Sequence, residues 1–117
     1  MNLEEIREQI DEIDAQILEL FCRRMDLVKQ VAEYKIENGL PVLHPGREQK
    51  ILDRVRLDGG EAYGDYAAAV FQRMMEVSRQ MQEKVIEAKQ KEPQKAVSKG
   101  EEAREAEKSE EAKKQVR

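Results

Sequence analysis

Apolar residues recur along the first third of the chain at alternating intervals of three and four positions. They are Leu3, Ile6, Ile10, Ile13, Ile17, Leu20, Leu27 and Val31. This spacing is typical of the a/d seam of a helix that packs against other helices. No proline or glycine interrupts the chain before Gly39, so the pattern predicts one helix from Asn2 to about Glu37. Such a helix is about 54 Å long and cannot bury its seam within one small protomer, which favours a partner chain.

Two further helices are predicted after the first. The Asn-Gly pair and the proline of residues 38–41 end the first helix. Residues 44–46, His-Pro-Gly, open a second helix, which ends around residues 58–60. A loop containing Tyr63 and Gly64 then leads to a third helix, for which Asp65 is the expected cap. The apolar stripe of the third helix consists of Ala67, Val70, Phe71, Met74, Val77, Met81 and Val85.

Composition agrees with a single all-α domain built from long helices. Charged residues make up 39% of the 117 positions and aromatic residues 4%, while the net charge is −4. This balance argues against nucleic-acid binding by bulk electrostatics. Charged residues begin at Glu4, and no apolar run approaches the ~18 residues of a membrane span, so we expect no signal peptide, no membrane contact and a cytoplasmic location. The one cysteine, Cys22, forms no internal disulfide and is interpreted as a small apolar residue.

The C-terminal part of the sequence differs from the rest. Residues 92–117 are rich in Glu, Lys and Ala and contain few large apolar side chains, so they cannot bury enough surface to join a core. We expect a helical domain over residues 1–91 and a charged tail, disordered or frayed-helical, over residues 92–117. A partner-binding role is the alternative for the tail.

Two cations lie in or beside the apolar seam of the first helix. Position 24 belongs to the apolar series but holds Arg24, and Lys35 falls within about 20° of it around the helix. Cations near a buried seam are costly unless an anion meets them, so they predict a site for a small anion with several negative groups. Arg7 lies about 25 Å from Arg24 along the axis and can reach such a site only from the other protomer of an antiparallel dimer.

The other two predicted helices also carry polar residues on faces that should meet, namely Arg47, Glu48, Ser78 and Gln82. Each has a structural explanation when taken alone, as a surface side chain, a register-setting residue or an interhelical hydrogen-bonding group. These explanations weaken when all three helices contribute such groups. No metal-ligand cluster, catalytic triad or phosphate-binding glycine loop is visible, so we expect neither a metal nor a cofactor.

At this point the sequence resembles a family. The segments 6–14, 23–28 and 45–48, together with Lys35, are similar in order and spacing to the all-helical chorismate mutases, and the likeness covers about residues 3–88. The resemblance implies three-helix protomers, each with one long N-terminal helix, that intertwine into a homodimer of the chorismate mutase II type with two equivalent sites.

The resemblance also implies a role for each matching residue. Arg24, together with Arg7 donated by the other protomer, would bind the two carboxylates of chorismate. Lys35 would contact a carboxylate and the ether oxygen, and Gln82 would donate to the same oxygen. The remaining site positions are Glu48, which would accept from the ring hydroxyl, Arg47 and Ser78, which would line the site, and His44, a candidate only, because the family often has aspartate there.

The implied reaction is the conversion of chorismate to prephenate in phenylalanine and tyrosine biosynthesis. It is an intramolecular [3,3] rearrangement that needs no nucleophile, metal or redox cofactor, only fixed cations and donors around a flexible diacid. One alternative is isochorismate–pyruvate lyase, which has a similar fold. Glu48 and Ser78 favour the mutase over this lyase. A second alternative is a non-catalytic helical dimer that regulates or docks on another aromatic-pathway enzyme.

Overall fold

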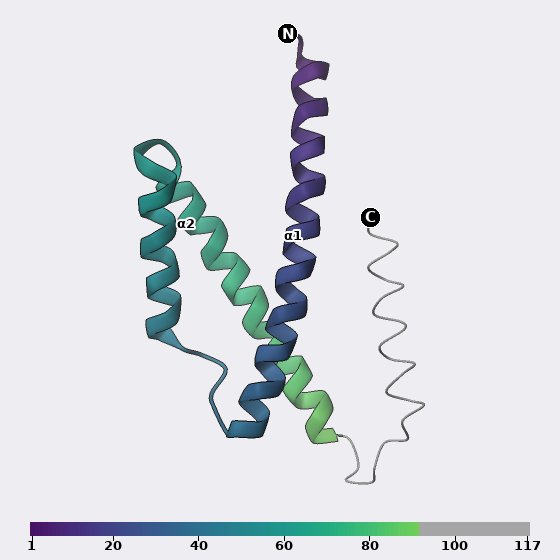
Figure 1. The fold of residues 1–117 in the computed structure, drawn as a ribbon, viewed down its shortest axis with the longest axis vertical. Coiled ribbons are helices and arrows are strands. Elements are labelled where there is room, and N and C mark those ends of the chain that lie inside the picture. The colour runs from purple at the N-terminus through teal and green to yellow at the C-terminus, as the bar shows by residue number, and fades with distance from the viewer. Residues whose placement is uncertain (92–117) are drawn as a thin grey trace. The chain divides into compact units, whose positions relative to one another are not determined.

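The computed structural model describes residues 1–91, and the regular structure in this part of the chain is entirely helical (Figure 1). Helix α1 comprises Leu3–Asn38 and helix α2 comprises Pro45–Lys91. The predicted all-α fold is therefore confirmed. The described chain forms two units, Met1–Leu27 and Val28–Lys91. The predicted tail, residues 92–117, lies outside the described residues.

Both ends of α1 are determined by local hydrogen bonds. At its start, Asn2 Oδ1 accepts from the Glu5 N–H at 2.9 Å and Glu5 Oε2 accepts from the Asn2 N–H at 3.2 Å, a reciprocal capping pair. At its end, Gly39 adopts a left-handed conformation with φ 63°. The N–H of Leu40 then donates to the Lys35 carbonyl at 2.9 Å, which closes the helix in a Schellman motif. The predicted bounds of this helix agree with the structure to within a residue.

Helix α2 is interrupted at one residue, Gly60, where φ is 69° and ψ is −171°. Only glycine adopts this backbone conformation readily. The break agrees with the predicted end of the second helix at residues 58–60. The predicted loop at residues 63–64 and the predicted cap at Asp65 are wrong, because the chain is helical again directly after Gly60. The chain reverses its direction at Gly60 through this single residue rather than through a loop (Figure 1). Helix α2 therefore consists of two segments, residues 45–59 and 61–91.

Glycines also allow the two segments of α2 to approach each other beside the break. A Cβ atom added to Gly59 would lie 2.8 Å from the Cα atom of Gly64, and one added to Gly64 would overlap the carbonyl oxygen of Arg56. The backbones are therefore in direct contact at this point. Gly64 was expected to mark a loop, but it serves as a helical contact position that no side chain can occupy.

The interior of the unit Val28–Lys91 is built from small and polar residues as well as apolar ones. Its buried apolar side chains are Ala32, Ala68 and Met75, and Ser78 and Gln82 are buried at 5% and 6% exposure. This buried face differs from the predicted stripe, since Val70 is 60% exposed. Small residues bring the helices close together and so determine which face is covered. No helix of residues 1–91 has a stretch apolar and long enough to cross a membrane.

Candidate active site

Lys35 and Gln82, which are separated by 47 positions in the sequence, form a direct hydrogen bond. Lys35 stands in the last turn of α1 and donates from Nζ to Gln82 Oε1 at 3.0 Å. Lys35 also donates to the backbone carbonyl of Val42, in the connection between the helices, at 2.6 Å. The ammonium group is thus held by one acceptor from α2 and one from the loop. These two predicted site residues are brought together within one unit.

Close packing of α1 against the second segment of α2 explains why this contact forms. Ala32 lies one turn before Lys35 and is fully buried, so no large side chain separates the helices there. Met75, Ser78 and Gln82 follow each other at helical spacing on the buried face of α2. Gln82 therefore projects toward the interior beside α1.

Burial changes the acid–base behaviour of Lys35. Partial desolvation lowers the pKa of its ammonium group below the ordinary value of 10.5, and the negative charge of Glu48 offsets part of this effect. The influence of Glu48 means that a carboxylate from the first segment of α2 also belongs to the surroundings of Lys35. The cluster therefore contains a partly buried cation, a buried amide and a nearby anion.

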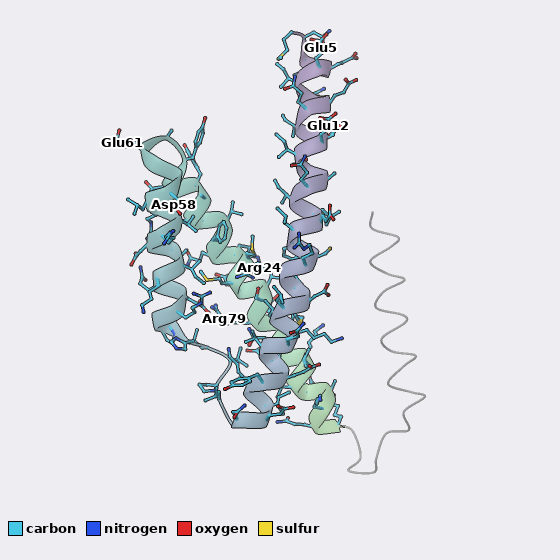
Figure 2. All side chains as sticks on the ribbon, in the orientation of Figure 1. Glu5, Glu12, Arg24, Asp58, Glu61 and Arg79 are labelled. Atoms are coloured by element: carbon cyan, nitrogen blue, oxygen red, sulfur yellow. The ribbon has the colours of Figure 1, made fainter. Side chains whose placement is uncertain are left out.

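Glu48 is paired with Arg79, a residue that the sequence analysis did not select. Arg79 Nη1 donates to Glu48 Oε1 across the two segments of α2, and both side chains are largely covered, at 27% and 23% exposure. Figure 2 shows Arg79 on the second segment of α2. The hydrogen bond to Glu48 raises the pKa of the Arg79 guanidinium. Arg79 lies four residues after Met75 and three before Gln82, but only the burial of these two neighbours and the contact with Glu48 mark it as a site residue.

Ser78 and His44, at the start of α2, each form a hydrogen bond with the backbone. The Ser78 hydroxyl donates to the Met74 carbonyl one turn earlier, at 2.8 Å. His44 precedes the first residue of α2 and is exposed, and its Nδ1 accepts from the backbone N–H of Arg47 at 3.0 Å. His44 thus acts as an N-terminal cap of α2. Arg47 itself is exposed.

The two remaining predicted site residues belong to the other unit. Arg7 is exposed and Arg24 is half-buried, both on the part of α1 within Met1–Leu27. Figure 2 labels Arg24 on α1. The contacts described above, among Lys35, Gln82, Glu48 and Arg79, all lie within Val28–Lys91.

Within residues 1–91, no group of three or more His, Cys, Asp or Glu side chains is arranged to hold a metal ion. The cluster offers hydrogen-bonding and charged groups of its own. It combines fixed hydrogen-bond donors, Lys35 and the Gln82 amide, with a carboxylate acceptor, Glu48. Such an arrangement suits a ligand that has both negative oxygens and a hydroxyl group.

The family model described as chorismate mutase type II matches residues 6–83 of this chain. The chain is also 40% identical over 90 residues to a chorismate mutase of Methanocaldococcus jannaschii, a match that covers 75% of this chain and 91% of that protein. No solved structure matches the chain significantly.

Two further relatives have names that include a second activity or a different substrate. A bifunctional chorismate mutase/prephenate dehydratase of Aquifex aeolicus is 39% identical over 53% of this chain, which spans only 17% of that protein. A 4-amino-4-deoxychorismate mutase of Streptomyces venezuelae is 36% identical over 44% of this chain and 50% of that protein. The family match and the archaeal relative confirm both the predicted resemblance and the predicted activity, and the chain belongs to the chorismate mutase type II family.

Proposed function

We propose that this chorismate mutase holds chorismate in its reactive shape and stabilises the charge that forms on the ether oxygen, with Lys35 and Gln82 as the two donors. The observation that carries the proposal is the hydrogen bond between Lys35 and Gln82, which keeps both groups at one point of the interior. The carbon–oxygen bond of the ether breaks as the new carbon–carbon bond forms, and no group leaves the molecule. Negative charge grows on the ether oxygen during this step, so fixed donors there lower the barrier.

Arg24 and Arg7 are the proposed partners of the two substrate carboxylates. Arg24 occupies an apolar position of the α1 seam, which supports a role in meeting a buried anion. Fixing both carboxylates removes rotational freedom before the reaction, a contribution that can amount to several kcal/mol, up to ~7–11 in the best intramolecular cases. Arg47, Ser78 and His44 are proposed only to line the site.

Glu48 is the proposed acceptor for the ring hydroxyl of chorismate. Its influence on the Lys35 pKa supports a position near the ammonium group. A carboxylate accepts through two oxygens, of which Arg79 engages only Oε1, so Oε2 is the proposed acceptor for the hydroxyl.

We further propose that the two segments of α2 act as separate helices, giving a three-helix protomer, and that two protomers form an intertwined homodimer. The apolar seam of α1 supports the dimer, because each of its eight members is between 41% and 60% exposed in the single chain. Surfaces of this kind are normally covered by a partner. In the dimer, Arg7 would complete the site of the other protomer.

Loss of chorismate absorbance on addition of the purified protein tests the proposed site. We expect Arg24→Ala and Lys35→Ala each to abolish most of the activity while the helical circular dichroism spectrum is retained. Arg23→Ala and Lys29→Ala are the matched controls, because both of these residues are exposed on the same helix, and they should be close to wild type. Normal turnover in either site variant would refute the assignment.

The product determines which enzymes can act next. The name of the Aquifex aeolicus relative joins a chorismate mutase to a prephenate dehydratase in one protein. We propose that prephenate made by this chain passes to a separate prephenate-consuming enzyme of the aromatic pathway in the cytoplasm. Residues 92–117 are the proposed segment for any docking, and assays of that enzyme with the full chain and with a chain lacking these residues would test this.

A further inference from the structure

We propose that Arg79 is a positioning residue that makes the site select a ring hydroxyl over a ring ammonium group. The inference rests on the proposed role of Glu48 as acceptor for the substituent at ring position 4. It extends that role to a residue that does not itself touch the substrate. The observation behind it is the ion pair between Arg79 and Glu48 across the two segments of α2.

Arg79 fixes the orientation of the Glu48 carboxylate. A glutamate side chain in a helix has several rotatable bonds, and a single exposed carboxylate samples many positions. Arg79 donates to one carboxylate oxygen from a helical segment that follows the Gly60 turn. Both side chains are mostly covered, so the pair is less screened by water than a surface ion pair. Oε1 is thereby fixed and Oε2 is left to accept from the substrate.

Arg79 also compensates the negative charge of Glu48. An uncompensated Glu48 would repel a dicarboxylate and would attract a cationic substituent. Arg79 cancels the charge of Glu48 without removing its ability to accept a hydrogen bond. A neutral hydroxyl can use the remaining acceptor, whereas an ammonium group would meet the positive charges of Arg79 and Lys35 as well as the carboxylate. The pair therefore disfavours the ammonium group through electrostatic repulsion.

The compound that separates these cases is 4-amino-4-deoxychorismate, in which an amino group replaces the hydroxyl at position 4. An aliphatic amine is protonated at neutral pH. The quantity to measure is the selectivity, defined as kcat/KM for chorismate divided by kcat/KM for the amino compound. A residue that acts only on folding would lower both values in parallel and leave this ratio unchanged.

The decisive variant is Arg79→Gln, with Arg79→Lys as the conservative rescue. We expect Arg79→Gln to lower the selectivity by on the order of tenfold, the size of effect that a partly covered charge near the substituent produces. The change should appear as a higher KM for chorismate and a lower KM for the amino compound. Arg79→Lys should restore most of the selectivity because it retains the charge. Arg54→Gln is the matched control, since Arg54 pairs with Asp58 on an exposed face of the first segment of α2.

A second variant tests the same idea in the opposite direction. Glu48→Gln keeps an acceptor but removes the main anionic partner of Arg79 and leaves only the weaker influence of Glu76 and Glu83, so the selectivity should rise even as both activities fall. The selectivity of Glu48→Gln still tests the proposal if Arg79→Gln does not fold. An unchanged ratio in either folded variant, or a change of opposite sign, would overturn the proposal. If wild-type protein turned over neither compound, the proposed function would fail instead, which is a distinct result.

Discussion

Replacing Gln82 by glutamate changes a permanent hydrogen-bond donor into one that donates only when protonated. Gln82 is 6% exposed, and its Oε1 accepts from Lys35 Nζ at 3.0 Å, so the introduced carboxylate would occupy nearly the same space beside the same cation. At this separation the attraction between the two charges is on the order of 5 kcal/mol for an effective dielectric constant of about 20. The variant is therefore expected to fold, with an ionised side chain at neutral pH.

The expected catalytic defect at neutral pH has two parts. One donor to the ether oxygen is lost, which typically costs about 10²–10³ in turnover, and a negative charge now faces the position where negative charge develops. Both parts disappear when the introduced carboxyl group is protonated. Activity should therefore rise about tenfold for each unit by which the pH is lowered, until the introduced carboxyl group is half protonated. The nearby ammonium of Lys35 favours the ionised form and moves this midpoint toward lower pH, whereas burial opposes that effect.

The assay is the initial rate of chorismate loss between neutral and acid pH for four proteins. Wild type and Gln80→Glu, an exposed position two residues away, should have similar and much flatter profiles. Gln82→Met, which can neither donate nor titrate, should be slow at every pH. A profile for Gln82→Glu that is as flat as that of Gln82→Met would refute the contact between Gln82 and the ether oxygen.

Three further predictions follow from Lys35 and from the glycines. Lys35→Met should reduce turnover by about 10²–10³ without lowering the melting temperature measured by circular dichroism, because burial already disfavours the charged form. The pH above which kcat/KM falls should lie below the ordinary lysine pKa of 10.5. The corresponding pH for kcat should be higher, because a bound dianion favours the ammonium form of Lys35. Lys35→Arg should move the alkaline fall of its remaining activity to higher pH. Gly60→Ala should destabilise the fold by about 1–3 kcal/mol in denaturant unfolding, whereas Gly46→Ala, whose added Cβ meets only the His44 ring at 3.6 Å, should not.

The pH dependence of stability has a definite sign for Lys35. Its folded-state pKa is lowered, so between that value and 10.5 the unfolded chain binds more protons than the folded chain. This group alone therefore makes stability increase as pH rises through that interval. The same interval is where catalytic activity should fall, so stability and activity change in opposite directions there. A loss of activity in this range would consequently not be an effect of unfolding at this residue.

Most of the helical layout could be predicted because it depends on local signals. The seam spacing of α1, the Asn2 cap and the Gly39 terminus each act within a few residues, and each agrees with the structure. The loop expected around Gly64 was wrong for a physical reason. A glycine signals a turn and a close helix contact equally well, and only the nearby Arg56 carbonyl shows which of the two applies.

The candidate site was predictable to a different degree for different residues. Lys35 and Gln82 could be selected because the order of the sequence motifs resembles that of the all-helical chorismate mutases. This resemblance connects two positions that lie far apart in the sequence. Arg79 could not be selected from composition, since charged residues make up 39% of the chain and most of them face water. Its significance depends on Glu48, 31 positions away, and on the single-residue reversal at Gly60 that brings the two segments together.

The hydrogen bonds of Lys35 explain how one side chain can be both fixed and available. An ammonium group has three hydrogens, and two of them are donated, one to Val42 and one to Gln82. The third is left for a substrate oxygen, and its direction is set by the other two. Because this order exists before the substrate binds, the substrate does not have to impose it, and little reorganisation remains for the step in which charge develops. Removal of either acceptor should then reduce turnover more than affinity, which connects the loop at Val42 to catalysis although it supplies no reacting group.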